Sequence, residues 1–504
     1  MTAFAAVLFA ATFTRTMERV ASTDPALATS VYDSHVVQLL YEPPLEVDYV
    51  ARPYKLVPGF CELPTVSADG LTYAFKVKVE GRGLQRKDGF DSSDMVRSLE
   101  RLRDPKVVSP NGWILKDVDT IRTLDARTVE IRLKRRCHYF PWLMAMSACG
   151  VLGPNGEGSG PYRLAHWHKN HEMVFVRKSN LHCTTTTADY DYFDEVKYLV
   201  VDDASTQWLM FLKGELDFLG EIARDNFDSV VGADGGLDPM LERQGVKLHS
   251  IPTMDVLHIG INMRDPVLGP NKKLRQALNA AFDYPAWEKF YNGRILPCTT
   301  PVPPGVEGRL ETPFLYAFNL DKAKRLMAEA GYPDGIDPKT GRRLVLTMSI
   351  GRPSQESREA GELMAAFYEK IGVKLEFDFK TWEAFLKAVN EGRVQLFRMG
   401  WVGDYPDAQN FLQLFYSKNM SPGPNHANYA NVAFDREYEA ALNALTAAER
   451  NRHWAACQKI VREDCPWIFT HINKSYSLVR PTVNNYLPTD FPYGAEKYYE
   501  YAVP

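Results

Sequence analysis

The segment 342–380 constrains the fold of this 504-residue chain more strongly than any other feature. It reads RRLVLTMSI, then ESREAGELMAAFYEKIG, then VKLEFDFK, which predicts a strand, a helix that ends at Gly372, and a second strand. LHIGINM at 257–263 also predicts a strand, and NKKLRQALNAAFDYPAWEKFY at 271–291 predicts a helix that follows a Gly-Pro turn. Strands that alternate with helices are typical of an α/β fold.

The first half of the chain differs because short period-two patterns dominate it. They occur at LTYAFKVKV (71–79), TVEIRLK (128–134) and MVFVRK (173–178), and each predicts a half-buried strand. With 45% hydrophobic and 24% charged residues, the chain can bury more than one core and is too long for one ordinary domain. We therefore predict two α/β lobes.

Charge and motif content exclude several classes of function. The formal net charge is only −4, and the one basic cluster, KRR at 134–136, lacks the aromatic residues that single-stranded nucleic acids require. We interpret this cluster as a solvated strand end and predict no nucleic-acid partner. The chain has no P-loop, G-x-S-x-G, HExxH or G-x-G-x-x-G motif. We therefore expect neither an enzyme nor a cofactor.

One segment carries the strongest functional signal. LFRMGWVGDYPDAQNF at 396–411 places Arg398, Trp401 and Asp404 at three-residue spacing, so in a loop leaving a strand they could converge on one small volume. A carboxylate pairs with a ligand ammonium, a guanidinium matches a ligand carboxylate in two places, and an indole adds apolar area. The pattern predicts a site for a zwitterion. The alternative is a strand end followed by Asp407 as a helix N-cap, with weak surface ion pairs.

Several further motifs occur in the order found in a known family. They are SGPYRL (159–164), FLKGELDF (211–218), LRQALNAAFDY (274–284), FNLDKAKRLMAEAGYPDG (318–335), NYANVAFDREYEAAL (428–442) and REDCPWIFTHI (462–472). Together with the segment 396–411, they are similar to the family 5 extracellular solute-binding proteins of ABC importers, most of all to the oligopeptide-binding proteins. The resemblance extends from residue 24 to residue 485, nearly the whole chain.

The resemblance implies a two-lobed, periplasmic-binding-protein-like α/β fold (type II, cluster C-like) with an inserted third subdomain. We expect a discontinuous first lobe made of residues 1–44, 179–256 and 476–504. The inserted subdomain would occupy residues 45–178, and the second lobe residues 257–475. Two crossovers would join the lobes and allow them to hinge about a ligand.

The resemblance also implies which residues bind a peptide. Asp404 matches the family's carboxylate for the peptide ammonium, and Arg398 matches its guanidinium for the carboxylate of a short peptide. Trp401 and Trp382 match two indoles of the pocket, and core packing of a helix is the alternative for Trp382.

Two more candidates, Asn428 and Tyr429, belong to a loop that the family places near the pocket. A turn residue is the alternative for Asn428. We expect this loop to contribute less to the site than the segment 396–411.

The cysteine and histidine patterns do not describe a metal site. The seven cysteines contain no CxxC pair and no zinc spacing. Cys137 and Cys149 flank a hydrophobic segment, and both a disulfide and buried free thiols are compatible with this pattern. HWHKNH brings together His166, His168 and His171, but it follows SGPYRL, where the family has an exposed hairpin. We therefore predict a hairpin and no metal.

The function implied is an extracytoplasmic receptor of an ABC importer that encloses oligopeptides between two lobes and delivers them to a membrane permease. We expect a monomer whose partners are the peptide and the permease subunits. A receptor of the same family for an oligosaccharide, a nickel chelate or haem is one alternative, and a hydrolase or structural envelope protein is another. Sugar sites favour stacked indoles with neutral polar groups, so Arg398 and Asp404 argue against an oligosaccharide.

The resemblance implies a location in the periplasm or cell envelope. AFAAVLFAATF at 3–13 is apolar like the core of a signal peptide, but it lacks a preceding basic region and a clear cleavage site. We predict that it belongs to the first buried strand and that the export signal is absent from this chain. No apolar run reaches the roughly 18 to 20 residues that span a bilayer.

Overall fold

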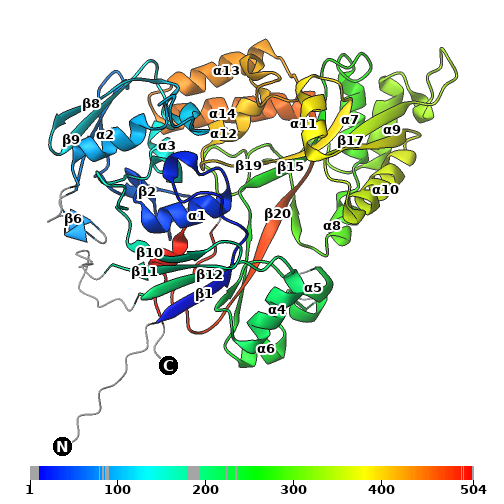
Figure 1. Ribbon diagram of the computed structural model, residues 1–504. Coiled ribbons are helices and arrows are strands. Elements are labelled where there is room, and N and C mark those ends of the chain that lie inside the picture. The colour runs from blue at the N-terminus through cyan, green and yellow to red at the C-terminus, as the bar shows by residue number, and fades with distance from the viewer. Residues whose placement is uncertain are drawn as a thin grey trace, which may run out of the picture. The chain divides into compact units, whose positions relative to one another are not determined.

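The computed structural model describes residues 11–78, 80–81, 84–85, 90–178, 192–222, 224–232, 235–489, 491 and 493–501 (Figure 1). The chain divides into two compact units, Met1–Ile251 with Ser475–Pro504, and Pro252–Lys474. It therefore passes between the units twice. The three-part division expected from the sequence, with its insert at residues 45–178, stays a prediction.

The first unit is built around a mixed sheet that contains the N-terminal strand. The strand order is β10-β11-β12-β1-β13-β20, and β14 also pairs with β20. The strands are β1 (Thr12–Thr16), β10 (Tyr162–His168), β11 (Glu172–Arg177), β12 (Glu195–Leu199), β13 (Phe218–Leu219), β14 (Lys247–Pro252) and β20 (Trp467–Val479), and only the last part of β20 belongs to this unit. β1 is parallel to β12 and β13, between which it lies. Residues 12 and 13 of the apolar stretch lie in β1, so the predicted first strand is confirmed for these two residues, while residues 3–10 of the stretch lie outside the described residues.

A second sheet and several helices complete the first unit. The strand order of this sheet is β4-β5-β9-β8. The remaining elements are β2 (Leu45–Val47), β3 (Leu56–Pro58), β4 (Thr65–Val66), β5 (Thr72–Lys76), β6 (Glu80–Gly81), β7 (Leu84–Gln85), β8 (Val118–Asp125), β9 (Thr128–Leu133), α1 (Val31–Leu40), α2 (Ser92–Glu100), α3 (Phe140–Leu143), α4 (Ala204–Lys213), α5 (Arg224–Val230), α6 (Pro239–Arg243) and the 3-10 helix η7 (Ala495–Tyr498). The strands predicted from the period-two patterns are confirmed as β5, β9 and β11.

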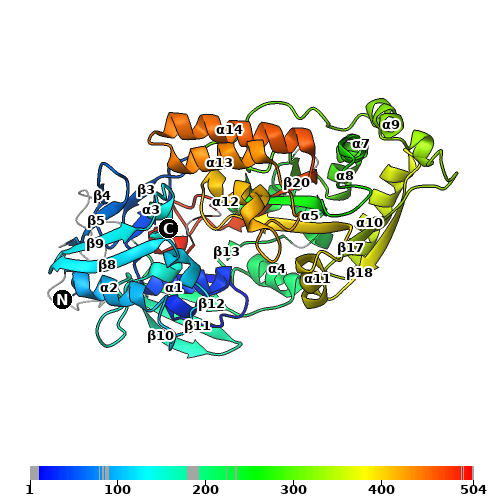
Figure 2. The same cartoon turned by 90° about the horizontal axis from the view of Figure 1, so that it is seen from above.

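The second unit is an α/β layer around the sheet β20-β15-β19-β17-β18, with β16 paired to β20. Its strands are β15 (Asp255–Ile261), β16 (Ile295–Pro297), β17 (Val345–Ile350), β18 (Lys374–Phe379) and β19 (Leu396–Val402). Its helices are α7 (Lys272–Ala281), α8 (Tyr284–Phe290), α9 (Leu320–Glu329), α10 (Gln355–Glu369), α11 (Trp382–Asn390), α12 (Ala408–Leu412), α13 (Val432–Asn443) and α14 (Ala447–Asp464). α10 packs against β18, and α13 lies beside α14 (Figure 2).

Most elements predicted for this unit are confirmed, with one correction. β17, α10 and β18 follow one another as predicted, and Gly372 has a φ of +77° just after α10. The prediction of a single helix over 271–291 is wrong, because the helical conformation is interrupted between α7 and α8. Asp283 caps α8 by accepting a hydrogen bond from the Ala286 amide at 3.2 Å, and Pro285 lies in the first turn of this new helix. Proline lacks the N–H that a continuous helix would need there.

Cys137 and Cys149 lie in the protein core, and the histidines of HWHKNH lie in a hairpin. Cys137 and Cys149 are buried and carry free thiols, and burial raises the pKa of Cys137 to about 12. β10 and β11 form the predicted hairpin, in which the rings of His168 and His171 lie 4.4 Å apart. In the part of the chain that the structure describes, no group of three or more histidine, cysteine or acidic residues could hold a metal ion. Cys183 lies outside the described residues.

The basic cluster at 134–136 directly follows the end of β9, as predicted. Arg135 is exposed and forms an ion pair with Asp117 at 2.8 Å. Lys134 and Arg136 donate to backbone carbonyls.

The C-terminal segment is tied into the first unit by buried charges. Glu496 in η7 is fully buried, and its Oε1 accepts from Nη1 of Arg15 at 2.6 Å. The neighbouring Lys497 donates to Glu46 at 2.5 Å, and Tyr498 donates to the same carboxylate. One ion pair therefore joins the C-terminal segment to β1 and a second joins it to β2, in addition to apolar packing.

Among the described helices, none combines the length and the apolar character needed to span a bilayer.

Candidate functional site

Three parallel strands of the second unit end at one edge of its sheet. Ile350, the last residue of β17, lies opposite Phe379 of β18 on one side and Arg398 of β19 on the other. The segments that leave β18 and β19 at this edge carry Trp382 and Asp404. Ligands of open α/β sheets bind outside the carboxyl ends of the strands. This edge is therefore the candidate ligand site of the second unit.

The predicted residues Arg398 and Trp401 lie within β19 itself, not in a loop that leaves a strand. Side chains three positions apart in a strand point to opposite faces of the sheet. Arg398 accordingly contacts Tyr291, whereas Trp401 contacts Asn410. The expectation that three side chains converge from one loop is thus wrong, and only Asp404 comes from the loop.

Asp404 is half-buried, and its carboxylate forms a hydrogen bond with one described residue. Its Oδ2 accepts from Nδ2 of Asn410 at 2.9 Å. Burial raises the pKa of Asp404 above its usual value, and the hydrogen bond from Asn410 offsets part of this effect. Asp404 forms no ion pair with any residue that the structure describes. A half-buried carboxylate without a cation is suited to an ammonium group supplied by a ligand.

Sequence reasoning missed Asn410, which connects two of the predicted residues. Asn410 is fully buried on α12, and its Oδ1 accepts from the Trp401 indole at 2.9 Å and from the Asp404 amide at 3.1 Å. One amide side chain thereby fixes both the indole and the carboxylate. The N-cap that belonged to the alternative interpretation of this segment is present, because Asp407 accepts from the Gln409 amide at 2.8 Å.

Arg398 is a second charged group that has no counter-charge among the residues the structure describes. Its Nη2 donates to the Tyr291 hydroxyl at 2.7 Å, and its guanidinium carbon lies 5.6 Å from the centre of the Trp287 ring. No carboxylate pairs with Arg398 within the described ranges of the chain. The guanidinium is therefore oriented by neutral and aromatic partners, and most of its N–H donors remain available to an anion.

Trp382 is 46% exposed at the first position of α11, where Thr381 caps the helix. Its ring stacks on Phe385 at 5.5 Å, and the Arg352 guanidinium lies 6.0 Å from its centre. Phe385 is fully buried, so it provides the core packing of this helix. Trp382 instead presents a large part of its indole to solvent at the carboxyl-end edge of the sheet.

The structure gives Asn428 and Tyr429 local partners. Asn428 has a φ of +53° and is 4% exposed, and its side chain bonds the Ser421 amide and the His426 carbonyl, as expected of a turn residue. Tyr429 is 1% exposed, and its hydroxyl donates to Asp464 at 2.6 Å. Both residues therefore have structural roles, and a contact with ligand stays a prediction for them.

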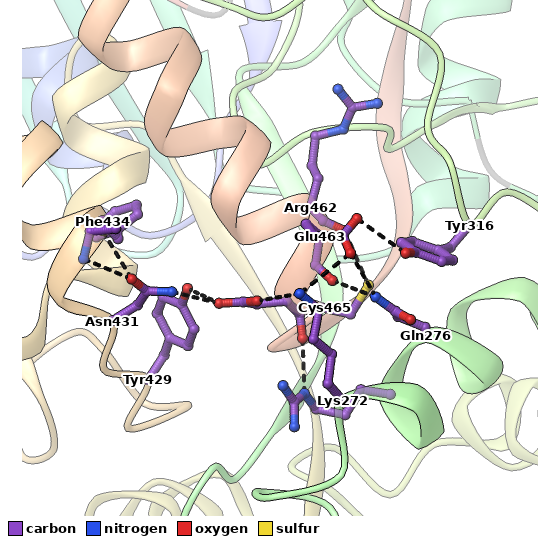
Figure 3. Close-up of polar contacts among 12 residues, drawn as sticks. Lys272, Gln276, Tyr316, Tyr429, Asn431, Phe434, Arg462, Glu463 and Cys465 are labelled. Atoms are coloured by element: carbon purple, nitrogen blue, oxygen red, sulfur yellow. Dashed lines mark hydrogen bonds and ion pairs between the residues drawn. The ribbon is translucent and has the colours of Figure 1, made fainter. Parts of the chain in front are cut away.

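The carboxylate that binds Tyr429 belongs to a larger polar network, which Figure 3 shows. Asp464 also accepts from Asn431 at 2.8 Å and pairs with Lys272 at 3.0 Å. The neighbouring Glu463 accepts from the hydroxyl of Tyr316 at 3.1 Å. Gln276 donates to the backbone carbonyl of Glu463 at 2.8 Å. Through Gln276, Tyr429 and the two acidic residues, the network joins three of the motifs identified in the sequence, LRQALNAAFDY, NYANVAFDREYEAAL and REDCPWIFTHI. Their shared role in the second unit is thus to attach α14 to α7 and to the segment 428–431.

Comparisons with known proteins agree with this architecture. Heme-binding protein A of Haemophilus influenzae is 25% identical over 477 residues, which cover 87% of this chain and 83% of that protein. Glutathione-binding protein GsiB of Escherichia coli strain K12 is 25% identical over 475 residues, covering 90% and 87%. The unliganded open form of MppA, a periplasmic murein tripeptide binding protein, superposes with a TM-score of 0.81 at 21% identity, covering 98% of this chain and 97% of that one.

The structural likeness shows that the chain has the α/β fold of a periplasmic binding protein. The model of the bacterial extracellular solute-binding proteins, family 5 Middle, matches residues 25–422. The chain belongs to this family. It is accordingly a solute-binding receptor of an ABC importer.

Proposed function

We propose that this protein is an extracytoplasmic receptor that encloses oligopeptides and delivers them to a membrane permease. The observation that carries the proposal is the pair of half-buried charges on and just after β19. Arg398 is a cation and Asp404 an anion, and neither forms an ion pair with a residue in the described part of the chain. A peptide is a zwitterion whose two ends supply the missing charges. Burying either charge without a partner would be costly, so the ligand that supplies both is favoured.

The chemistry of the relatives' ligands is compatible with this proposal. The relatives and the solved structure reported above are described as binding heme, glutathione and a murein tripeptide. Glutathione and a murein tripeptide both carry an ammonium and a carboxylate, whereas heme carries carboxylates and no ammonium. Asp404 therefore favours a peptide over heme, and the proposal assigns the chain no catalytic step and no cofactor.

The identity of the ligand can be tested on protein purified without a denaturation step. Native mass spectrometry should show a population of masses above that of the free chain, and their release should yield peptides on sequencing. Release of a porphyrin, a metal chelate or an oligosaccharide would overturn the assignment to peptides while leaving the family membership unchanged.

Replacing Arg398 with alanine is expected to weaken binding most for peptides of the length that places the C-terminal carboxylate beside the Arg398 guanidinium. Peptides of other lengths should lose less affinity. A fixed cation reaches the carboxylate only when the peptide ends beside it. The loss should be about 1.5 to 3 kcal/mol for the matching length, the usual contribution of a hydrogen bond to a charged group. Calorimetry with di- to pentaalanine measures the dependence on length.

Arg393→Ala is the matched control, because Arg393 pairs with Glu391 on the surface just before β19. It should leave every affinity unchanged. An equal loss for all lengths with Arg398→Ala would mean that Arg398 supports the fold and does not meet the peptide carboxylate.

A further inference from the structure

The Arg398 guanidinium rests on an aromatic cluster from α8 and β20. Tyr291 lies one residue beyond the end of α8, and its ring packs edge-on against Trp287 at 5.2 Å. The ring of His471 from β20 lies 5.1 Å from that of Tyr291 and accepts a hydrogen bond from the Trp287 indole at 3.1 Å. The Tyr291 ring is thus held between two other rings, and its hydroxyl receives the Arg398 hydrogen bond at 2.7 Å.

This cluster adds no charge that would compete for an anion. His471 is 2% exposed, and burial together with the nearby Arg398 lowers its pKa to about 3, so its imidazole is neutral at neutral pH. Its Nδ1 accepts from the Trp287 indole, which requires that nitrogen to be unprotonated. Arg398 is therefore the cation of the cluster.

A hydroxyl at this place constrains the guanidinium. An unpaired arginine side chain has many rotamers, and fixing one costs free energy that otherwise reduces the affinity for an anion. The Tyr291 hydroxyl occupies one N–H of Nη2 and leaves the other donors of the planar fork free. A phenylalanine at this position would keep the ring packing and lose the hydroxyl that accepts from Arg398.

We infer that Tyr291 is a positioning residue, which presets the Arg398 guanidinium for the ligand's terminal carboxylate. This inference rests on the proposed function and deepens it, because it makes a free carboxylate a requirement of the site. Tyr291 contacts the guanidinium, so the effect of a positioning residue here should appear only through the ligand's carboxylate.

The test compares alanine oligopeptides that end in a free carboxylate with the same peptides as C-terminal amides. Wild type should bind the acids more tightly than the amides. Tyr291→Phe should lower the affinity for the acids about 3- to 10-fold, the range expected for one lost hydrogen bond, and leave the amides unchanged. Tyr284→Phe is the matched control, since it removes a hydroxyl from the same helix that bonds the Ile295 carbonyl and not Arg398.

A double-mutant cycle with Arg398→Ala gives the second measurement, because Tyr291→Phe should have no further effect once the guanidinium is gone. Equal losses for acids and amides, or additive losses in the cycle, would overturn the inference and make Tyr291 a packing residue. If wild type itself binds acids and amides equally, the role proposed for Arg398 fails first and that of Tyr291 fails with it. The two failures are thus distinguishable.

Discussion

Replacing Asp404 with asparagine is expected to weaken peptide binding by about 2 to 4 kcal/mol, because it leaves an enclosed ammonium without its counter-charge. The substitution is nearly isosteric, and the new amide oxygen can still accept from Nδ2 of Asn410, which bonds Asp404 at 2.9 Å in the wild type. The loss of binding free energy should therefore result from the removed charge and not from a rearrangement of α12. Calorimetry with free and N-acetylated peptides measures it.

N-acetylation removes the same charge from the ligand, so acetylated peptides should lose a similar free energy on the wild type. For the Asp404→Asn variant, N-acetylation of the peptide should lower the affinity little further. Asp407→Asn is the matched control, because it removes a carboxylate three residues away while asparagine can still cap α12. Equal affinity of the wild type for free and acetylated peptides would remove the role assigned to Asp404.

The affinity should also depend on pH in a defined direction. Only the ionised carboxylate binds an ammonium, and burial raises the pKa of Asp404 despite the hydrogen bond from Asn410. Affinity should therefore fall on acidification at a pH above about 3.9, where an ordinary aspartate takes up its proton. In Asp404→Asn this part of the pH dependence should be absent.

The sequence predicts the local elements of this fold well because their determinants are local. Period-two patterns identified β5, β9 and β11, and the strand-helix-strand pattern identified β17, α10 and β18. The break between α7 and α8 was also encoded locally, since Asp283 and Pro285 form an N-cap and first turn. It was missed because the apolar periodicity continues across the break.

The candidate site is predicted only in part, because its geometry depends on distant packing. The motif at 396–411 identifies Arg398 and Asp404, but the side of the sheet that each faces follows from the pairing of β19 with its neighbours. Tyr291 lies 107 positions from the arginine it holds, so no local pattern reveals it. Asn410 is only six positions from Asp404, yet its role requires α12 to fold back onto β19.

The family motifs illustrate a further limit of sequence reasoning. Tyr429 belongs to a motif near the expected pocket, but its hydroxyl is bound to Asp464 at the end of α14. Lys272 of α7 pairs with the same carboxylate. Residues of a shared motif can therefore hold the scaffold together, and the motif alone does not separate that role from ligand contact.

The second large effect concerns the stability of the first unit. Glu496→Gln is expected to destabilise it by about 3 to 5 kcal/mol, because the substitution leaves the Arg15 guanidinium without its carboxylate in a largely buried place. The Arg15 side chain is 17% exposed and that of Glu496 is fully buried, and their ion pair spans 2.6 Å. Glu369→Gln, which breaks a surface pair with Arg343, is the control and should change stability by less than about 1 kcal/mol.

The pH dependence of this effect follows from the same contacts. Burial alone would raise the pKa of Glu496, but the nearby His35 and Arg15 lower it further than burial raises it, so the pKa in the folded protein is depressed. A depressed pKa stabilises the fold above the pKa of the unfolded glutamate, about 4.3, and the stabilisation is lost as the pH falls through the folded value. The difference between wild type and Glu496→Gln should therefore be full at pH 7 and shrink below about pH 4.

Hydrogen exchange provides the measurement, because the effect should be confined to one unit. Amides of β1 and of residues 494–499 should exchange faster in Glu496→Gln, since the ion pair joins these two segments. Amides of β17 and β18, which belong to the other unit, serve as an internal reference and should keep their wild-type rates. Uniform acceleration across both units would mean that they unfold as one cooperative body, and unchanged rates in β1 would mean that apolar packing, not the buried ion pair, holds the C-terminal segment in place.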